Sequence, residues 1–303
     1  MSAASTSPFS PGVLRRPETE STPFDSILFE SPVLLAGRFR APAGDPRFPD
    51  TGPIWNHIFV FPRSTVEIRP AGAEAFVADP NIVPFYNRGQ LYTRVAVSED
   101  GDRCEWFAFR DAVVLEAVGL FSGAAAGRPD RPFPFRFGPT DPESYWRQRR
   151  LVEALAAGKP EDPLCVEEEM LGIFVKLLTA AFQTRPSEGG ARQNRRRRDL
   201  VEAARRLLGR RFRDPLSLTE MARELDVSPF HLSRVFHEGT GSTLHAYRNS
   251  LRLAAALEAM RDEQPDLTAV ALDLGYSSHS HFTSSFRRQF GLPPSEARQL
   301  LRT

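Results

Sequence analysis

The amino-acid sequence predicts a two-domain α+β protein: an N-terminal antiparallel β-barrel or sandwich, connector helices, and an all-α C-terminal domain. Residues 32–109 contain closely spaced runs rich in Val, Ile, Phe and Tyr, separated by Gly, Pro, Asp and Asn. This pattern is typical of antiparallel strands joined by turns. Residues 216–300 instead repeat a helix-turn-helix pattern. A chain of 303 residues is long enough for two domains, each with its own core.

The N-terminal segment and the cysteines indicate where such a protein would work. Residues 1–25 are rich in Pro and Ser, so we expect them to be disordered. They lack the basic start and apolar core of a secretory signal, and no apolar run is long enough for a membrane span. The two cysteines, Cys104 and Cys165, form neither a disulfide framework nor a C-x-x-C metal pair. We therefore expect a cytoplasmic protein that binds no membrane.

The β-rich region is expected to form one domain over residues 26–140. Its strands should be short, because turn-forming residues interrupt the sequence every few positions. The expected strands are residues 33–40, 54–61, 65–69, 75–78, 82–87, 91–97 and 103–109.

Aromatic side chains of this domain are candidates for the wall of an effector pocket, since an apolar barrel mouth is a common place for small molecules to bind. The candidate pocket residues are Trp55, His57, Phe59, Tyr86, Tyr92, Cys104 and Trp106. Packing in the core explains each of them at least as well, because a strand buries alternate residues with or without a ligand. The same holds for Cys104, which is either a sensor thiol or, as we favour, a small buried residue.

The region offers few ligands for a metal. A metal-dependent barrel enzyme needs several His and a carboxylate around one ion, and His57 is the one His between residues 26 and 140. We therefore expect no metal, no cofactor and no enzymatic activity.

Residues 141–183 are expected to form two connector helices. Each begins with an Asp-Pro pair, at Asp141 and at Asp162, which suits a helix cap followed by Pro at the first helical position. The second helix is apolar over a wide arc, so it should pack against the β domain or against a second copy of the chain. Residues 184–194 are expected to be a flexible linker. The basic run 195–198 then begins the C-terminal domain as a solvated helix start or a phosphate contact.

The first copy of the repeated pattern spans residues 217–236. Ser217 and Glu220 have the spacing of a capping box, which marks a helix start. After a turn at 226–228, Ser228 is the next cap and Pro229 occupies the first helical position. The inward residues of the second helix are Leu232, Val235 and Phe236, which leaves Phe230, Ser233, Arg234 and His237 facing outward.

The second copy spans residues 267–286. Gly275 supplies the turn and Ser278 the cap. Phe282 and Phe286 face inward, which leaves His279, Ser280, Thr283 and Arg287 facing outward. One such hairpin could belong to a plain helical bundle, but two copies about fifty residues apart indicate paired helix-turn-helix units.

These residues resemble the DNA-binding domain of the AraC/XylS family of bacterial transcription regulators. Residues 228–236 (SPFHLSRVF) and 239–241 (GTG) resemble the first recognition helix of the family and its end. Residues 274–278 (LGYSS), 281–291 (HFTSSFRRQFG) and 294–295 (PS) resemble its C-terminal signature. The resemblance covers about the last hundred residues. In this context residues 26–140 resemble the cupin-like sensor half of many such regulators.

The resemblance implies a seven-helix domain in which one long helix, residues 243–260, holds two recognition helices about one duplex turn apart. The buried stripe of that helix is expected at Leu244, Tyr247, Leu251, Ala254 and Leu257. The implied base-facing side chains are Phe230, Ser233 and Arg234 in the first copy and His279, Ser280, Thr283 and Ser284 in the second. The family often has Arg at the position of Ser284. The second copy should therefore read fewer bases, or depend on Arg287 and Arg288 for phosphate contacts.

The charge distribution agrees with a nucleic-acid partner. Residues 192–303 hold 19 Arg and Lys against 13 Asp and Glu, whereas residues 1–191 hold 20 against 25. Double-stranded DNA is thus the expected partner, and RNA polymerase, a small-molecule effector and a second copy of the chain are further candidates. Two rival classes stay open: a cupin-type enzyme and a DNA-repair alkyl-transfer protein with an AraC-like domain. The second would need a reactive cysteine cluster, which two cysteines 61 positions apart in sequence do not suggest.

Overall fold

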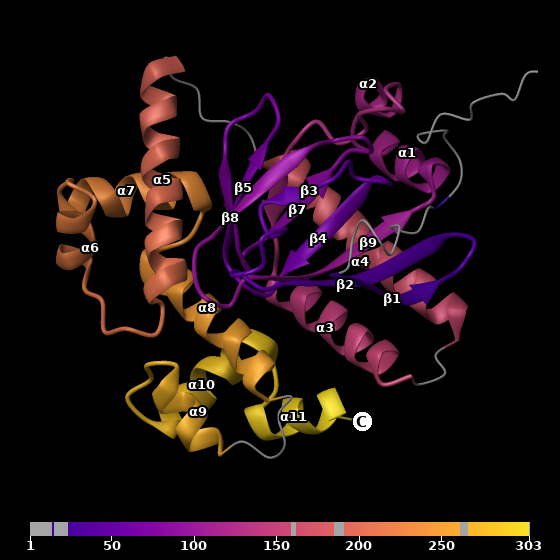
Figure 1. The fold of residues 1–303 in the computed structure, drawn as a ribbon. Helices are drawn as coiled ribbons and strands as arrows, with labels where there is room; N and C mark the ends of the chain where they lie inside the picture. The colour runs from indigo at the N-terminus through magenta and orange to yellow at the C-terminus, as the bar shows by residue number, and fades with distance from the viewer. Residues whose placement is uncertain (1–13, 15–23, 159–161, 185–190, 261–265, 303) are drawn as a thin grey trace, which may run out of the picture.

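The computed structural model describes residues 14, 24–158, 162–184, 191–260 and 266–302. Most of the segment 1–25 and residues 185–190 of the expected linker lie outside them. Within the described residues a β domain is joined to a helical C-terminal domain (Figure 1). This arrangement confirms the predicted α+β fold class.

The β domain contains two antiparallel sheets. The six-stranded sheet has the order β1-β2-β9-β4-β7-β10, and the four-stranded sheet has the order β3-β8-β5-β6. Their strands are β1 (Asp25–Glu30), β2 (Leu34–Ala41), β3 (Asp50–Thr51), β4 (Ile58–Pro62), β5 (Val66–Pro70), β6 (Phe76–Ala78), β7 (Ile82–Tyr86), β8 (Tyr92–Ala96), β9 (Asp102–Phe109) and β10 (Phe137–Pro139).

Each of the seven expected strands overlaps an observed one, with one large shift in a boundary. The strand expected from residue 54 begins at Ile58, because Ile54 bonds through its backbone to the 89–90 turn instead of to a strand. Strands β1, β3 and β10 were not predicted. Strands β3 and β10 are two and three residues long, and the pairing of β1 shifts register between Ile27 and Phe29. None of the three shows the regular alternation that marks a strand in sequence.

Four helices accompany the sheets. Helices α1 (Asp111–Gly119) and α2 (Gly123–Ala126) fall in a stretch for which no helix was predicted. Helices α3 (Pro142–Ala156) and α4 (Pro163–Gln183) are the predicted connectors. Their caps are also as predicted: Asp141 accepts from the Ser144 N–H at 3.1 Å, and Asp162 from the Leu164 N–H at 3.0 Å.

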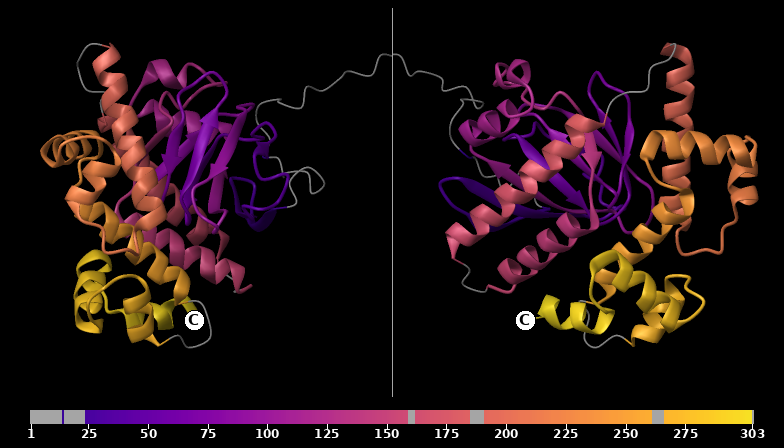
Figure 2. Two further views of the ribbon diagram at one scale, coloured as in Figure 1. Left: turned by 60° about the vertical axis from the view of Figure 1, so that its left-hand side comes forward. Right: turned by 180° about the vertical axis from the view of Figure 1, so that it is seen from behind.

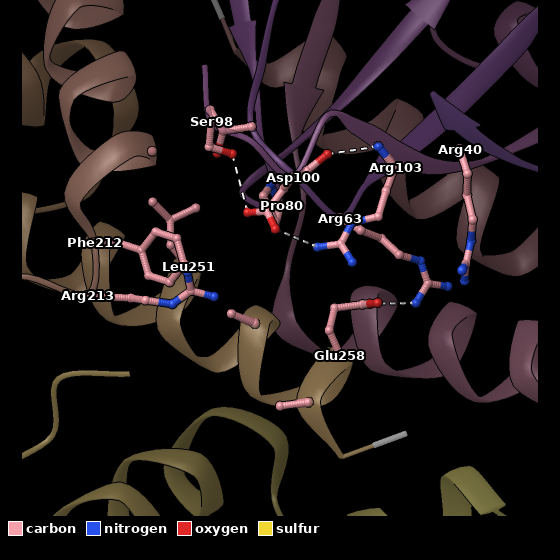
Figure 3. A pocket seen from close by; sticks show the side chains of 15 residues that line it. Arg40, Arg63, Pro80, Ser98, Asp100, Arg103, Phe212, Arg213, Leu251 and Glu258 are labelled. Atoms are coloured by element: carbon pink, nitrogen blue, oxygen red, sulfur yellow. Dashed lines mark hydrogen bonds and ion pairs between the residues drawn. The ribbon is translucent and has the colours of Figure 1, made fainter. Parts of the chain in front are cut away.

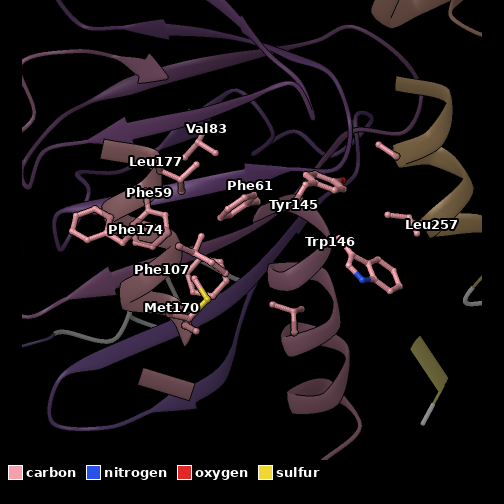
Figure 4. Packing of buried hydrophobic residues seen from close by; sticks show 14 of the residues in the cluster. Phe59, Phe61, Val83, Phe107, Tyr145, Trp146, Met170, Phe174, Leu177 and Leu257 are labelled. Carbon is pink, nitrogen blue, oxygen red and sulfur yellow. The ribbon is translucent and has the colours of Figure 1, made fainter. Parts of the chain in front are cut away.

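The six-stranded sheet is buried on both faces. One face carries Phe59, Phe61 and Phe107 and packs on α3 and α4, where the rings of Phe59 and Phe174 lie 4.9 Å apart (Figure 4). The alternate residues, such as Val60, face the four-stranded sheet and share a second core with it. Since successive side chains of a strand point to opposite faces, neighbouring residues enter different cores.

The C-terminal domain contains seven helices among the described residues, as the family resemblance implied. They are α5 (Ala191–Arg211), α6 (Leu218–Glu224), α7 (Pro229–Thr240), α8 (Leu244–Ala259), α9 (Leu267–Asp273), α10 (His279–Phe290) and α11 (Pro294–Arg302). Helix α5 begins inside the range 184–194 that was expected to be linker, and the basic run 195–198 lies within it.

The two ends of the helical domain lie against the β domain. Helix α5 runs beside the edge of the four-stranded sheet, while α10 and α11 pack below α3 (Figures 1 and 2). Helix α8 crosses between these two contacts and connects them (Figure 1). Both ends of the helical domain are thereby attached to the β domain.

Candidate nucleic-acid interface

The first helix-turn-helix unit, α6 and α7, begins each helix with the predicted cap. Ser217 Oγ accepts from the Glu220 N–H at 3.2 Å, and the Glu220 carboxylate accepts from the Ser217 N–H at 2.8 Å. This reciprocal pair is a capping box. Ser228 Oγ accepts from the His231 N–H at 3.2 Å, and Pro229 follows at the first helical position.

The second unit, α9 and α10, repeats this design. Asp266 caps α9, and Ser278 Oγ accepts from the His281 N–H at 3.2 Å at the start of α10. Helices α7 and α10 are each 12 residues long, and each ends at a left-handed glycine, Gly241 or Gly291. Local sequence therefore specifies the same hairpin twice.

Both units also make the same turn between their helices. Asp226 after α6 (φ 53°) and Gly275 after α9 (φ 80°) adopt the left-handed conformation. In each turn the following N–H donates to a carbonyl five residues earlier, at 2.9 and 3.0 Å. A Cβ on Gly275 would lie 2.2 Å from the Arg213 carbonyl oxygen. The second turn therefore requires glycine, whereas the first accommodates Asp.

Helix α7 exposes every side chain that was predicted to face DNA. Phe230 is 77% exposed, so it does not close the domain core. Ser233, Arg234 and His237 are also exposed. The opposite side of the helix is buried at Leu232, Val235 and Phe236.

Arg234 makes a weak ion pair within α7. Its Nη1 lies 3.5 Å from Glu238 Oε1, and Arg197 Nη1 of α5 lies 3.1 Å from Glu238 Oε2. Exposed pairs of this kind contribute little to stability, because solvent and salt screen them. Arg234 can therefore leave Glu238 at small cost when an acceptor on a base becomes available.

Helix α10 presents a different surface. His279, Ser280, Ser284 and Arg287 are exposed. Thr283 is half-buried, and its Oγ is buried with no hydrogen-bond partner among the described residues. The middle of this helix thus carries hydroxyls where α7 carries Arg234, and its cations lie in the last turn at Arg287 and Arg288.

Helix α8 connects the two units and is buried along most of the predicted stripe. Tyr247, Leu251, Ala254 and Leu257 are buried, whereas Leu244 is half-buried. Arg252 on the same helix was not among the predicted residues. Its Nε donates to the Phe212 carbonyl at 2.6 Å and its Nη1 to the Gly275 carbonyl at 2.7 Å. The guanidinium of Arg252 thus connects, through hydrogen bonds, the end of α5 and the turn of the second unit.

A buried polar triad joins the first half of the helical domain to the β domain. The Tyr247 hydroxyl donates to Asp79 Oδ2 at 2.6 Å and accepts from Arg205 Nε at 2.7 Å. Asp79 is 0% exposed. Burial raises the pKa of Tyr247 well above its usual value, so the hydroxyl stays protonated and donates a hydrogen bond to Asp79. The three residues come from three separate parts of the chain, so no local sequence pattern predicts their contact.

Helix α5 also closes the edge of the four-stranded sheet. Glu202 accepts from the Val77 N–H of edge strand β6 at 2.6 Å, which satisfies a donor that an edge strand would otherwise expose. Arg206 pairs with Glu67 of β5. Gly209 allows close approach, since a Cβ there would lie 2.5 Å from Thr65 Cγ2.

The second unit is attached separately, through apolar packing. The rings of Trp146 on α3 and Phe290 at the end of α10 lie 6.0 Å apart. Buried residues of α8, α10 and α11 belong to the same continuous core as α3, α4 and the six-stranded sheet. The β domain thus holds each unit by a different contact.

The predicted pocket residues lie in separate environments of the β domain. Phe59 faces the core shared with α4, whereas Tyr86, Cys104 and Trp106 face the core between the two sheets, with half-buried Tyr92 stacked on Tyr86. The opposite faces follow from the strand alternation of β4 and β9.

His57 packs instead against Phe133 of the core shared with α4, with their rings 6.0 Å apart. Trp55 is half-buried. His57 is 1% exposed, lies 3.0 Å from the Pro129 carbonyl and accepts from the Arg88 N–H at 3.1 Å. Burial and nearby acidic groups raise the pKa of Cys104 well above its usual value. A thiol in this environment is not activated as a thiolate.

Within the described part of the chain, no three His, Cys, Asp or Glu side chains are placed to hold a metal ion. The described helices include none with the length and apolarity needed to cross a membrane.

Comparison with known proteins agrees with the geometry of the two units. Residues 221–300 match a family model described as a helix-turn-helix domain. The transcriptional activator RhaS of Escherichia fergusonii is 31% identical over 164 residues, which are 52% of this chain and 58% of that protein. The regulatory protein SoxS of Escherichia coli K12 is 36% identical over 87 residues, which are 29% of this chain and 81% of SoxS.

The chain thus spans little more than half the length of the RhaS relative. Among solved structures, ToxT of Vibrio cholerae covers 89% of this chain at 13% identity with a TM-score of 0.35, a likeness too low to support a structural conclusion. The match to most of SoxS, together with two helix-turn-helix units in tandem, shows that the chain belongs to the AraC/XylS family of DNA-binding transcription regulators.

Proposed function

We propose that this protein binds specific DNA sites by placing α7 and α10 in two successive major grooves. The observation that carries the proposal is the duplicated unit: two 12-residue helices with equivalent caps, equivalent turns and an exposed polar face. A recognition helix needs a buried inner side for support and an outer side free for base edges. Both helices meet this requirement.

The side chains suggest how each helix would act. Arg234 can donate two hydrogen bonds to guanine O6 and N7, and exposed Phe230 can contact a thymine methyl. On α10, Ser280 can bond to a base or a phosphate, while Arg287 and Arg288 suit phosphates. Phosphate contacts and helix N-termini would provide most of the affinity. The first unit would therefore specify its bases more strictly than the second.

We also propose that the β domain regulates DNA binding by controlling how the two units are placed. The polar triad holds the first half, and the contact between Trp146 and Phe290 holds the second. An effector that binds one arrangement of the domains more tightly than another would shift the protein toward that arrangement. The affinity for DNA could change by no more than the ratio of the effector's affinities for the two arrangements. An activating role that involves RNA polymerase is supported by the description of the RhaS relatives as activators.

A second copy of the chain is a further proposed partner. Leu164 and Leu171 lie one heptad apart on α4 and are exposed, which is the spacing of an apolar stripe between paired helices.

Selection of bound sites from random duplex DNA tests the reading of DNA. Full-length protein should enrich two short boxes whose centres are about 10 base pairs apart, the spacing of successive major grooves. The Arg234→Ala variant should relax the preference at one base of one box and leave the other box unchanged. Enrichment of a single box, or of no sequence, would refute the proposal of two reading helices.

A further inference from the structure

A cavity of about 520 Å³ lies between the β domain and the DNA-binding domain (Figure 3). Its β-domain wall comes from β2, the turn after β4, and the segment that leads into β9. Its opposite wall comes from the end of α5 and from α8. The volume is typical of a site for a small molecule, and the cavity is distinct from the aromatic residues inside the β domain.

The wall of this cavity is basic. It includes four guanidinium groups, those of Arg40, Arg63, Arg103 and Arg213, against two carboxylates. Hydroxyls are also present, among them those of Ser64, Thr65 and Ser98. Since cations outnumber anions and the other polar groups are largely hydroxyls, the cavity suits an anion that accepts several hydrogen bonds.

The two carboxylates in the wall are already engaged. Glu258 of α8 accepts from Arg63 Nη1 at 2.8 Å and lies 2.8 Å from Arg149 Nη1. Asp100 lies 3.3 Å from Arg103 Nη2. Burial alone lowers the pKa of Arg63, but Glu105 and Glu258 outweigh burial and leave it raised. Arginine side chains are not deprotonated in proteins, so the wall carries four cations.

Two donors of these guanidinium groups lack a partner. The Arg63 side chain is 3% exposed, yet its Nη2 has no hydrogen-bond acceptor among the described residues. Arg103 Nε is likewise buried without an acceptor. A buried donor left unpaired is costly, so a small rotation that brings either guanidinium to an acceptor in the cavity would be favoured.

We propose that the cavity binds a small organic anion with two or more negative charges, carried by carboxylate or phosphate groups. Such a molecule would contact Arg63 and Arg103 from the β domain and Arg213 from the DNA-binding domain. A neutral or cationic ligand would not match a wall in which guanidinium groups outnumber carboxylates. A single long acyl chain would meet a mainly polar wall.

A ligand at this position would act as an effector of DNA binding. This regulatory role, unlike the anion site itself, rests on the proposed function. It would contact both domains at once, so it would stabilise the arrangement in which the walls face each other. By linkage, DNA and the anion would change each other's affinity by the same factor.

Thermal unfolding and calorimetric titration of the full-length protein test the proposal. The probes are citrate and pyrophosphate, with sodium chloride at matched ionic strength as the reference. We expect one anion to bind per chain and to raise the unfolding temperature beyond the effect of chloride. Stronger binding of citrate than of pyrophosphate would assign the site to carboxylates, and the reverse to phosphates.

Variants locate the site. Arg103→Gln and Arg213→Gln remove charge from partly exposed side chains, so both proteins should fold, which circular dichroism would verify. Each should weaken anion binding at least tenfold. The matched control is Arg150→Gln, which removes an exposed arginine of α3 outside the cavity and should leave anion binding unchanged.

The failure of this inference can be told apart from failure of the DNA-binding proposal. Equal effects of all salts at one ionic strength, or equal anion binding by the cavity variants and the control, would overturn the anion site while selected DNA is still bound. Anion binding that follows the variants, in a protein that selects no DNA sequence, would leave the site established and refute the DNA-reading function.

Discussion

Replacement of Tyr247 by Phe removes one oxygen at the junction between the two domains. That oxygen donates to Asp79 at 2.6 Å and accepts from Arg205 at 2.7 Å, and Asp79 is 0% exposed. The ring remains, together with its edge contact to Phe236 at 5.2 Å, so no cavity of importance forms. The change therefore isolates the polar contacts.

The expected cost follows from the charges that lose a partner. A hydrogen bond to a charged group contributes about 1.5–3 kcal/mol, and a charge left buried without a partner costs more. Arg205 Nε lies 3.6 Å from Asp79, so a small shift can restore a direct ion pair and offset part of the loss. We expect Tyr247→Phe to lower the free energy of unfolding by about 2 kcal/mol.

Urea denaturation followed by circular dichroism measures this change. The control is Tyr276→Phe, since the Tyr276 hydroxyl donates at 2.9 Å to the neutral Asn249 side chain within the DNA-binding domain and should contribute about 1 kcal/mol or less. A double-mutant cycle with Asp79→Asn would report the coupling directly. A loss for Tyr247→Phe no larger than that of the control, or a coupling near zero, would refute the role of the triad as an interdomain link.

Three other predictions concern the DNA surface, a half-buried carboxyl and the second turn. Arg234→Ala should weaken specific DNA binding by about 1–3 kcal/mol and relax preference at one base, measured by titration against base-substituted sites; a uniform loss over all sequences would make Arg234 a phosphate contact. Burial raises the pKa of Asp25 from 3.8 to about 6, so the folded state binds this proton more tightly than the unfolded state and loses stability as pH rises from about 4 to about 6. Asp25→Asn should remove that part of the pH dependence and stabilise the protein at pH 7, as urea titrations across this range would show; parallel curves for the two proteins would contradict the shift. Gly275→Ala should lower the free energy of unfolding by more than about 1 kcal/mol, which is the cost of backbone strain alone, because the new Cβ would also lie 2.2 Å from a backbone oxygen. Gly158→Ala is the control and should cost less, since Gly158 also has a positive φ but has open space around it. Equal melting temperatures for these two variants would count against the steric argument.

Local features of the helical domain could be predicted because short stretches of sequence encode them. A capping box, a Ser cap and a Pro at the first helical position each act within four residues. Ser217, Ser228 and Ser278 accordingly cap the helices where they were expected to. Helical spacing likewise predicted the inward and outward sides of α7 and α10, except at Thr283, which was expected to face outward and is half-buried with a buried Oγ.

Prediction was weaker where two faces of one sheet were both buried. The alternation of a strand shows that Phe59 and Val60 point in opposite directions, but it does not show what covers each side. Packing of α4 on one face and the four-stranded sheet on the other decided this. The aromatic residues expected around one pocket were therefore divided between two cores.

The sequence by itself determined the fold class, the duplicated helix-turn-helix units, their caps and turns, and, apart from Thr283, the side chains of α7 and α10 that face outward. These properties depend on residues close together in the chain and on periodicity. The tertiary structure alone decided the triad of Asp79, Arg205 and Tyr247, the closure of the sheet edge by Glu202, and the basic cavity between the domains. Each of these joins residues more than 100 positions apart, and their contact energies exist only once the two domains have packed together.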